Sequence, residues 1–252
     1  MKKIILTLFW PEEKISFSDH VDKTTSFLQK ISAYSPLFNN LFLVNGDSKK
    51  ETTTPLAKLK EKIAEHAIRL DRNYTNLDPN GKIQDQSYCK MGFVTHLTSS
   101  QPRNDVSIII TEGGYEEGFI NNCVSITLSE NCLLEFSGSE VRLRNWIVDL
   151  ILLNISHWKA CKAKIFNFQF SKILSGSKVS DIGWISFFKH ISLEEIPAKS
   201  ELLGMGITWE AVPQGGTLFM LDQEMVSADN PEHVARGKLL RARLMEHGWI
   251  EN

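Results

Sequence analysis

Three glutamates within six residues form the densest group of side chains that could do chemistry in this sequence. Glu112, Glu116 and Glu117 lie in the glycine-rich stretch 112–118, which we expect at a turn between two strands. Neighbouring carboxylates can divide the roles of acid and base or hold a divalent cation. With no histidine or fourth ligand nearby, a solvated hairpin tip is the first interpretation, a protein-binding tip the second and a metal-dependent hydrolase the third.

The sequence contains none of the common catalytic motifs. Ser137 and Ser139 lie in F-S-G-S-E, which lacks the G-x-S-x-G frame of a serine nucleophile. The seven histidines form no H-E-x-x-H or H-x-H pair that would place two imidazoles on one metal. Gly204 and Gly206 begin a G-x-G, but Trp209 stands where a dinucleotide fingerprint needs its third glycine. We therefore predict a protein that is not an enzyme and that uses no cofactor or metal.

Charge is strongly segregated along the chain, although the net charge is only −2. Residues 104–140 contain seven acidic residues and no Lys or Arg, and residues 181–232 contain nine acidic residues against two lysines. Between them, residues 141–180 contain seven bases and one acid. Acidic surfaces repel nucleic acid and attract basic proteins, so we expect a protein partner and no direct nucleic-acid binding. The other interpretation, held equally, is that folding scatters these acids over several faces.

Aromatic residues beside expected turns add possible anchors for a partner, because exposed Tyr and Trp often contribute most of the energy of protein interfaces. Tyr115, Trp184 and Trp209 are such residues. Together with the acids around them they form the predicted partner-binding set, which is Glu112, Tyr115, Glu116, Glu117, Trp184, Trp209, Glu210, Asp222 and Glu224.

The start of the chain predicts a strand rather than a targeting signal. Its apolar run ends at Trp10-Pro11 without a small-residue cleavage site. No stretch approaches the roughly twenty apolar residues of a membrane span. Four scattered cysteines without a C-x-x-C pair are typical of a reducing compartment. We expect a cytoplasmic protein without membrane contact, and the sequence does not determine its oligomeric state.

The order of elements predicts an α+β fold with largely antiparallel sheets and helices packed on them. A strand at residues 3–9, a helix capped by Ser18, a strand at 37–44 and a helix after Thr54-Pro55 open the chain. The elements expected after these are strands at 90–98, 106–111, 119–128 and 164–170, a helix from Ser139, a turn or short helix at 184–190, a hairpin at 206–221, and a last helix after Asn230. The division is either two lobes, 1–135 and 136–252, or one continuous domain.

Several short motifs resemble the immunity protein 52 family of bacterial polymorphic toxin systems. Phe9-Trp10 and S-P-L-F at 35–38 resemble its N-terminal part. D-I-G-W-I-S-F-F at 181–188, V-P-Q-G-G-T-L at 212–218 and N-P-E-H-V-A at 230–235 resemble its C-terminal part. The resemblance implies an immunity protein that binds and neutralises a cognate toxin, expected to be a nuclease with a restriction-endonuclease-like fold delivered by type VI secretion. It transfers no contact residue.

Overall fold

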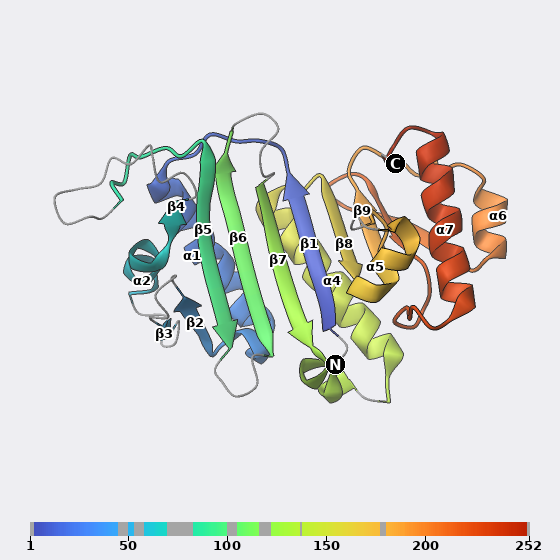
Figure 1. The fold of residues 1–252 in the computed structure, drawn as a ribbon, viewed down its shortest axis with the longest axis horizontal. Coiled ribbons are helices and arrows are strands. Elements are labelled where there is room, and N and C mark those ends of the chain that lie inside the picture. Colours follow the sequence, from blue (N-terminus) through green and yellow to red (C-terminus); the bar gives the residue numbers. More distant parts are fainter. Residues whose placement is uncertain are drawn as a thin grey trace. The chain divides into compact units, whose positions relative to one another are not determined.

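The computed structural model describes residues 3–44, 50–52, 58–69, 83–99, 105–115, 122–136, 138–176 and 180–250. These residues form two compact units, shown in Figure 1. One unit is Phe9–Cys132, and the other combines Met1–Leu8 with Leu133–Asn252. The two-lobe division with a boundary at 135/136 stays a prediction about domains, because compactness alone does not establish independent folding.

The unit Phe9–Cys132 is built on an antiparallel sheet. Its neighbouring strands are, in order, β7 (Asn122–Ser129), β6 (Val106–Gly114), β5 (Met91–Ser99), β2 (Leu41–Val44) and β3 (Lys50–Thr52), and the short β4 (Ile68–Arg69) also pairs with β5. The β5 to β6 register places Phe93 opposite Glu112. Glu112 therefore points to the same face as the buried Ile108 and Ile110, since side chains alternate along a strand.

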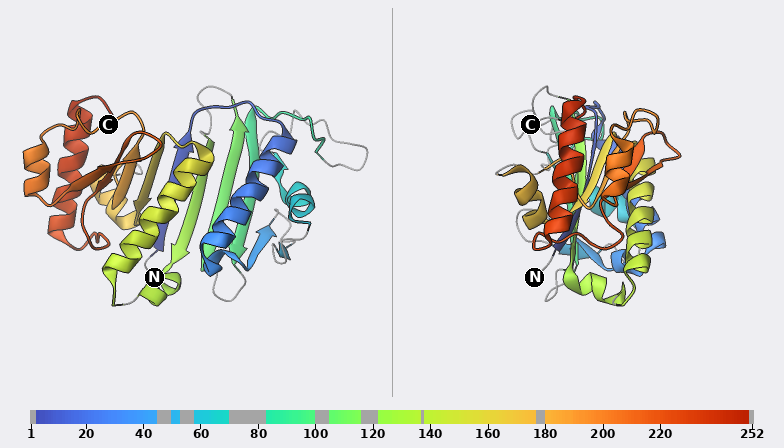
Figure 2. Two further views of the ribbon diagram at one scale, coloured as in Figure 1. Left: turned by 180° about the vertical axis from the view of Figure 1, so that it is seen from behind. Right: turned by 90° about the vertical axis from the view of Figure 1, so that its right-hand side faces the viewer.

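Helix α1 (Phe17–Tyr34) packs on that buried face of β5 and β6 (Figure 2). It begins earlier along the chain than expected. Ser16, not Ser18, is the N-cap, because Asp19 completes a capping box with the Ser16 side chain and backbone. The 3₁₀ turn Pro36–Phe38 follows α1. Helix α2 (Leu59–His66) packs beside α1.

The second unit has a sheet in the order β10 (Thr208–Ala211), β11 (Thr217–Met220), β9 (Ile185–Phe188), β8 (Lys162–Phe166) and β1 (Lys3–Trp10). Helix α4 (Glu140–Trp158) and helix α5 (Phe168–Ser175) lie on opposite faces of β8 (Figures 1 and 2). The 3₁₀ turn Leu134–Phe136 and the short helix α6 (Lys199–Gly204) also belong to this unit, and α7 (Pro231–Glu246) packs on α5. The short helix α3 (Glu130–Leu133) spans the point in the chain where one unit ends and the other begins. The α+β prediction is confirmed.

Two expected elements of the second unit are wrong. The strand expected at 164–170 ends at Phe166, because Asn167 caps α5 by accepting the backbone N–H of Gln169 at 2.8 Å. The turn or short helix expected at 184–190 contains strand β9, whose four residues are all buried. A strand buried on both faces shows no alternation, so its period is not visible in the sequence.

Lys164 on β8 is a buried cation. The residue is 4% exposed, and its ammonium donates to the Ser180 carbonyl at 2.5 Å. Burial lowers the pKa of Lys164 to about 8, while the Asp181 carboxylate offsets part of that effect and the Lys162 ammonium adds to it. The folded state therefore releases the Lys164 proton at a lower pH than the unfolded chain.

This difference predicts how stability depends on pH. The folded-state pKa of Lys164 is about 8 and the ordinary value for a lysine is 10.5. Between these two values the unfolded chain binds more protons, so the free energy of unfolding should rise with pH, by an amount on the order of 3 kcal/mol. Urea denaturation at pH values across this range would measure the rise, and Lys164→Met should remove most of it. Equal pH slopes for the two proteins would contradict a lowered pKa.

Candidate functional site

The described residues of the predicted partner-binding set belong to two different units of the chain. Glu112 and Tyr115 lie in the unit Phe9–Cys132, whereas Trp184, Trp209, Glu210, Asp222 and Glu224 lie in the other unit. Glu116 and Glu117 lie outside the described residues. The seven that can be placed therefore divide into two groups, and each group contains one fully buried residue, Glu112 or Trp184.

Glu112 is completely buried, which corrects the expectation that it lies on a solvated or partner-binding tip. Its Oε2 is 3.3 Å from His20 Nδ1, and its Oε1 is 2.8 Å from Lys23 Nζ. His20 Nε2 is 3.0 Å from Thr95 Oγ1. Helix α1 supplies His20 and Lys23, and β6 supplies Glu112. The ion pair with Lys23 and the contact with His20 offset the cost of burying the Glu112 carboxylate inside the unit.

Thr95, His20 and Glu112 form a hydroxyl, imidazole and carboxylate chain of the kind found in triad hydrolases. All three residues are 0% exposed, and the His20 ring stacks on Phe93 with centroids 5.6 Å apart. No substrate can reach the hydroxyl in this conformation. The described residues also contain no group of three or more His, Cys, Asp or Glu positioned to hold a metal. We therefore assign the Glu112 network a structural role.

Tyr115 is half-buried at the end of β6. Lys14 Nζ lies 5.4 Å from the Tyr115 ring centroid and 4.6 Å from that of Tyr88, which is 44% exposed. A lysine shared between two aromatic faces is a cation–π arrangement. The described part of this region presents aromatic rings and a cation, while the Glu116 and Glu117 part of the predicted acidic tip stays a prediction.

Trp184 is 1% exposed, so the expectation of an exposed aromatic anchor is wrong for this residue. Its indole Nε1 donates to the Asp222 carbonyl at 3.0 Å, and its backbone N–H donates to the Ile165 carbonyl at 2.6 Å. The preceding Gly183 makes this approach possible, since a Cβ there would overlap the Ile165 carbonyl oxygen. The G-W pair therefore reflects close packing of two backbone segments.

Asp222 joins the buried Trp184 to the start of α7. Its Oδ2 pairs with the Arg236 guanidinium and lies 3.3 Å from His233 Nε2. The Ser227 N–H donates to His233 Nδ1 at 2.9 Å, and burial lowers the pKa of His233, an effect that Glu224 and Glu232 only partly offset. A neutral imidazole with its proton on Nε2 satisfies both contacts. Asp222 is thus mainly an internal partner.

Trp209 and Glu210 lie on β10, the edge strand in the order of that sheet. Trp209 is half-buried and packs on Phe219 with centroids 6.5 Å apart, while Glu210 is exposed. Glu224, in the segment after β11, is also exposed. These three residues are the accessible part of the predicted set in this unit.

Folding pairs several acids of the 181–232 stretch with bases of the same unit. Asp181 lies 2.5 Å from Lys162, Asp222 pairs with Arg236, and Glu201 binds Arg243 at 2.8 and 2.9 Å. Glu232 also lies 3.8 Å from Arg236, and the exposed carboxylates that remain from this stretch are Glu194, Glu195, Glu210, Glu224 and Asp229. Pairing inside the unit therefore leaves fewer accessible carboxylates than the sequence count predicts, and whether they share one face stays a prediction.

The sequence interpretation missed a second accessible surface, on α5 and α7. Phe168 and Ile173 are 58% and 45% exposed on α5, and a groove beside α7 includes Lys238 and Arg241. The signal was present in α7, where positions 238, 241, 242 and 245 share one helical face. It could not be interpreted because α5 was expected to be a strand.

A family model described as immunity protein 52 matches residues 7–252. The chain belongs to the immunity protein 52 family. This confirms the resemblance drawn from the short motifs. Among solved structures, the family member is similar to Pseudomonas aeruginosa T6SS protein PA0821, with a TM-score of 0.57 and 9% sequence identity, over 97% of this chain and 73% of that chain. At that identity the likeness is one of fold alone. No curated protein sequence matches the chain significantly.

Proposed function

We propose that the protein binds and neutralises a cognate toxin, and that it does so by occupying a toxin surface rather than by catalysis. The observation that carries this proposal is the match of the immunity protein 52 family to residues 7–252, nearly the whole chain. The burial of Thr95, His20 and Glu112 is consistent with it, because this triad-like arrangement has no access to a substrate. No helix among the described residues is long and apolar enough to cross a membrane.

The toxin proposed is a nuclease with a restriction-endonuclease-like fold, delivered by type VI secretion and met by this protein in the cytoplasm. A nuclease must carry a basic surface to hold the phosphate backbone of its substrate. The exposed acids of the β10 to β11 region, Glu210 and Glu224 among them, have the complementary charge. The fold shared with a T6SS protein supports the delivery route.

Trp209 is the proposed aromatic anchor of this contact. It is half-buried on an edge strand. Trp is enriched among the residues that contribute most of the binding energy of protein interfaces. Nanomolar affinity or better is required, because a small free fraction of a nuclease is lethal.

Co-expression with the toxin encoded in the neighbouring gene tests the proposal. The wild-type protein should restore growth and should co-purify with the toxin. Glu210→Lys combined with Glu224→Lys should slow association roughly 10- to 100-fold at low salt. Glu61→Lys with Glu65→Lys on α2 is the matched control, since both glutamates are exposed in the other unit. Growth inhibition that persists with wild-type protein, without a complex, would disprove toxin neutralisation.

A further inference from the structure

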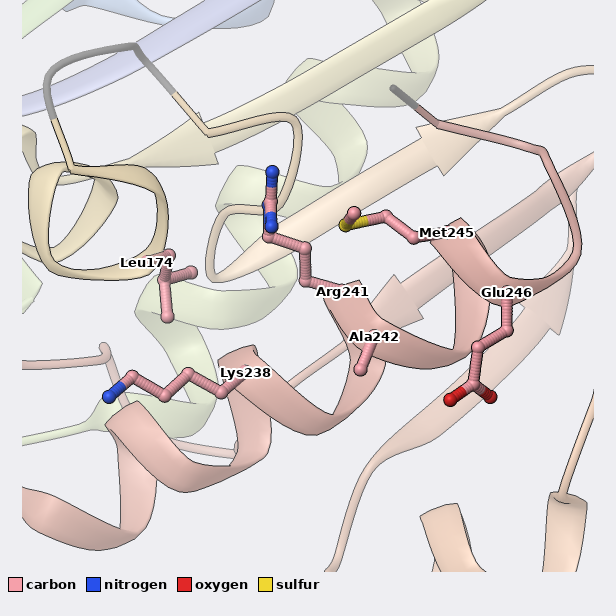
Figure 3. A pocket seen from close by; sticks show the side chains of 6 residues that line it. All are labelled: Leu174, Lys238, Arg241, Ala242, Met245 and Glu246. Atoms are coloured by element: carbon pink, nitrogen blue, oxygen red, sulfur yellow. The ribbon is translucent and has the colours of Figure 1, made fainter. Parts of the chain in front are cut away.

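A groove runs between α5 and α7 in the unit that contains Leu133–Asn252 (Figure 3). Its volume is about 510 Å³, and its lining residues are Leu174, Lys238, Arg241, Ala242, Met245 and Glu246. The α7 residues 238, 241, 242 and 245 recur at helical spacing, so they present one continuous stripe to the groove. The floor is apolar and the rim is charged.

The two helices are held close at a fixed point, so the groove is part of the packed fold. A Cβ on Gly237 would lie 2.8 Å from Leu174 Cδ2 and 3.1 Å from Phe170 Cζ. Only a glycine lets α7 approach α5 this closely without moving those side chains. The groove therefore opens next to a tight helix contact and should keep its shape without a ligand.

The charges in the groove are unbalanced in favour of cations. Glu246 is bound to Arg243 at 2.7 Å, and its side chain points away from Met245 in Figure 3. For Lys238 and Arg241, no carboxylate of the described residues lies within ion-pair distance. By contrast, Arg236 and Arg243 of the same helix both bind carboxylates. Within the part of the chain that the structure describes, the groove thus presents two cations without an ion-pair partner above an apolar floor.

The adjoining face of α5 extends this surface with exposed apolar side chains. Phe168 is 58% exposed and Ile173 is 45% exposed. A second groove of about 510 Å³ follows the same helix and includes Lys172, Ile173 and one carboxylate, Asp229. A partner that covers these side chains would remove their apolar surface from water, which favours binding.

We propose that the α5–α7 groove binds an acidic, amphipathic segment of the cognate toxin, an inference that rests on the proposed function. Apolar side chains of that segment would fill the floor at Leu174 and Met245, and its carboxylates would pair with Lys238 and Arg241. Charge complementarity selects this occupant, because a basic segment would be repelled by both cations. This contact uses other residues than the acidic β10 to β11 surface of the same unit and is opposite to it in charge.

Two variants of the full chain test the groove against the purified toxin. Lys238→Glu with Arg241→Glu reverses its charge, and Ala242→Trp fills its space. Both should weaken the measured affinity about 100-fold, since they disrupt complementary charge and shape at a buried contact. Lys189→Glu with Lys199→Glu is the charge-matched control on exposed lysines of the same unit and should change affinity less than about threefold. Thermal melts should show all variants folded.

The outcomes separate this inference from the proposed function. If the wild-type protein does not bind the toxin, the proposed function fails and takes the inference with it. If wild-type binding is tight and both groove variants bind within about threefold of it, the groove inference alone is overturned. Concentration-dependent self-association that the variants abolish, with toxin binding intact, would also overturn it by making a second copy the occupant.

Discussion

Replacing Gly183 with alanine should destabilise the protein by about 2–4 kcal/mol, the range of severe overpacking in a core. The added methyl carbon would overlap the Ile165 carbonyl oxygen and would lie 2.8 Å from the carbonyl carbon. Backbone atoms cannot turn aside as a side chain can. The clash would push the backbone at Gly183 and Trp184 away from β8 and break the 2.6 Å hydrogen bond from the Trp184 N–H to the Ile165 carbonyl. Urea denaturation measures the loss.

Gly204→Ala is the matched control for this prediction. Gly204 ends α6, and nothing lies within 4 Å of a Cβ placed there. Alanine should leave stability unchanged or raise it by up to about 1 kcal/mol, because it has the higher helix propensity. A Gly183→Ala protein that unfolds at the wild-type urea concentration would show that the backbone approach at Ile165 is not rigid.

Replacing Glu112 with alanine should cost about 2–4 kcal/mol, somewhat below the usual loss for a broken buried ion pair. The buried His20 would lose its carboxylate partner, and the vacated space would not be filled. The cost is moderated because the Lys23 side chain is 40% exposed and keeps Glu13 at 3.0 Å as a second partner. Chemical denaturation of the variant measures this directly.

The same variant distinguishes the structural role of Glu112 from that of a ligand in a metal-dependent hydrolase. Glu61→Ala on the exposed face of α2 should change stability by less than about 0.5 kcal/mol and serves as its control. Calorimetric titration with Mg²⁺ and Mn²⁺ supplies the second readout. A Glu112→Ala protein with wild-type stability but a lost cation site would contradict the structural assignment.

Elements with clear end signals could be predicted from the sequence. Ser139 caps α4, and Asn230 with Pro231 begins α7, as expected. The hairpin of β10 and β11 also lies where the V-P-Q-G-G turn predicts it, with both Gly215 and Gly216 at positive φ. These features depend on neighbouring residues, so a single sequence contains the needed information.

The candidate site was less predictable because it depends on contacts between distant residues. His20 and Glu112 are 92 positions apart, and no local pattern indicates that α1 covers that carboxylate. Trp184 follows a glycine, a pattern that is typical of turns. Its side chain is nevertheless buried, because it directly precedes β9, which is buried on both faces. The ion pair between Asp222 and Arg236 likewise forms only in the folded chain and has no signal in the sequence. Counts of charge along the chain therefore overestimated the number of accessible carboxylates.

Titration of the purified toxin with this protein tests the central claim most directly. Light scattering after size exclusion would measure the complex, and the toxin's own activity would measure inhibition. We predict a complex with a Kd in the nanomolar range or below, and complete inhibition at about one molar equivalent. Full toxin activity in the presence of a roughly tenfold excess of folded protein, with no complex at micromolar concentration, would contradict the account.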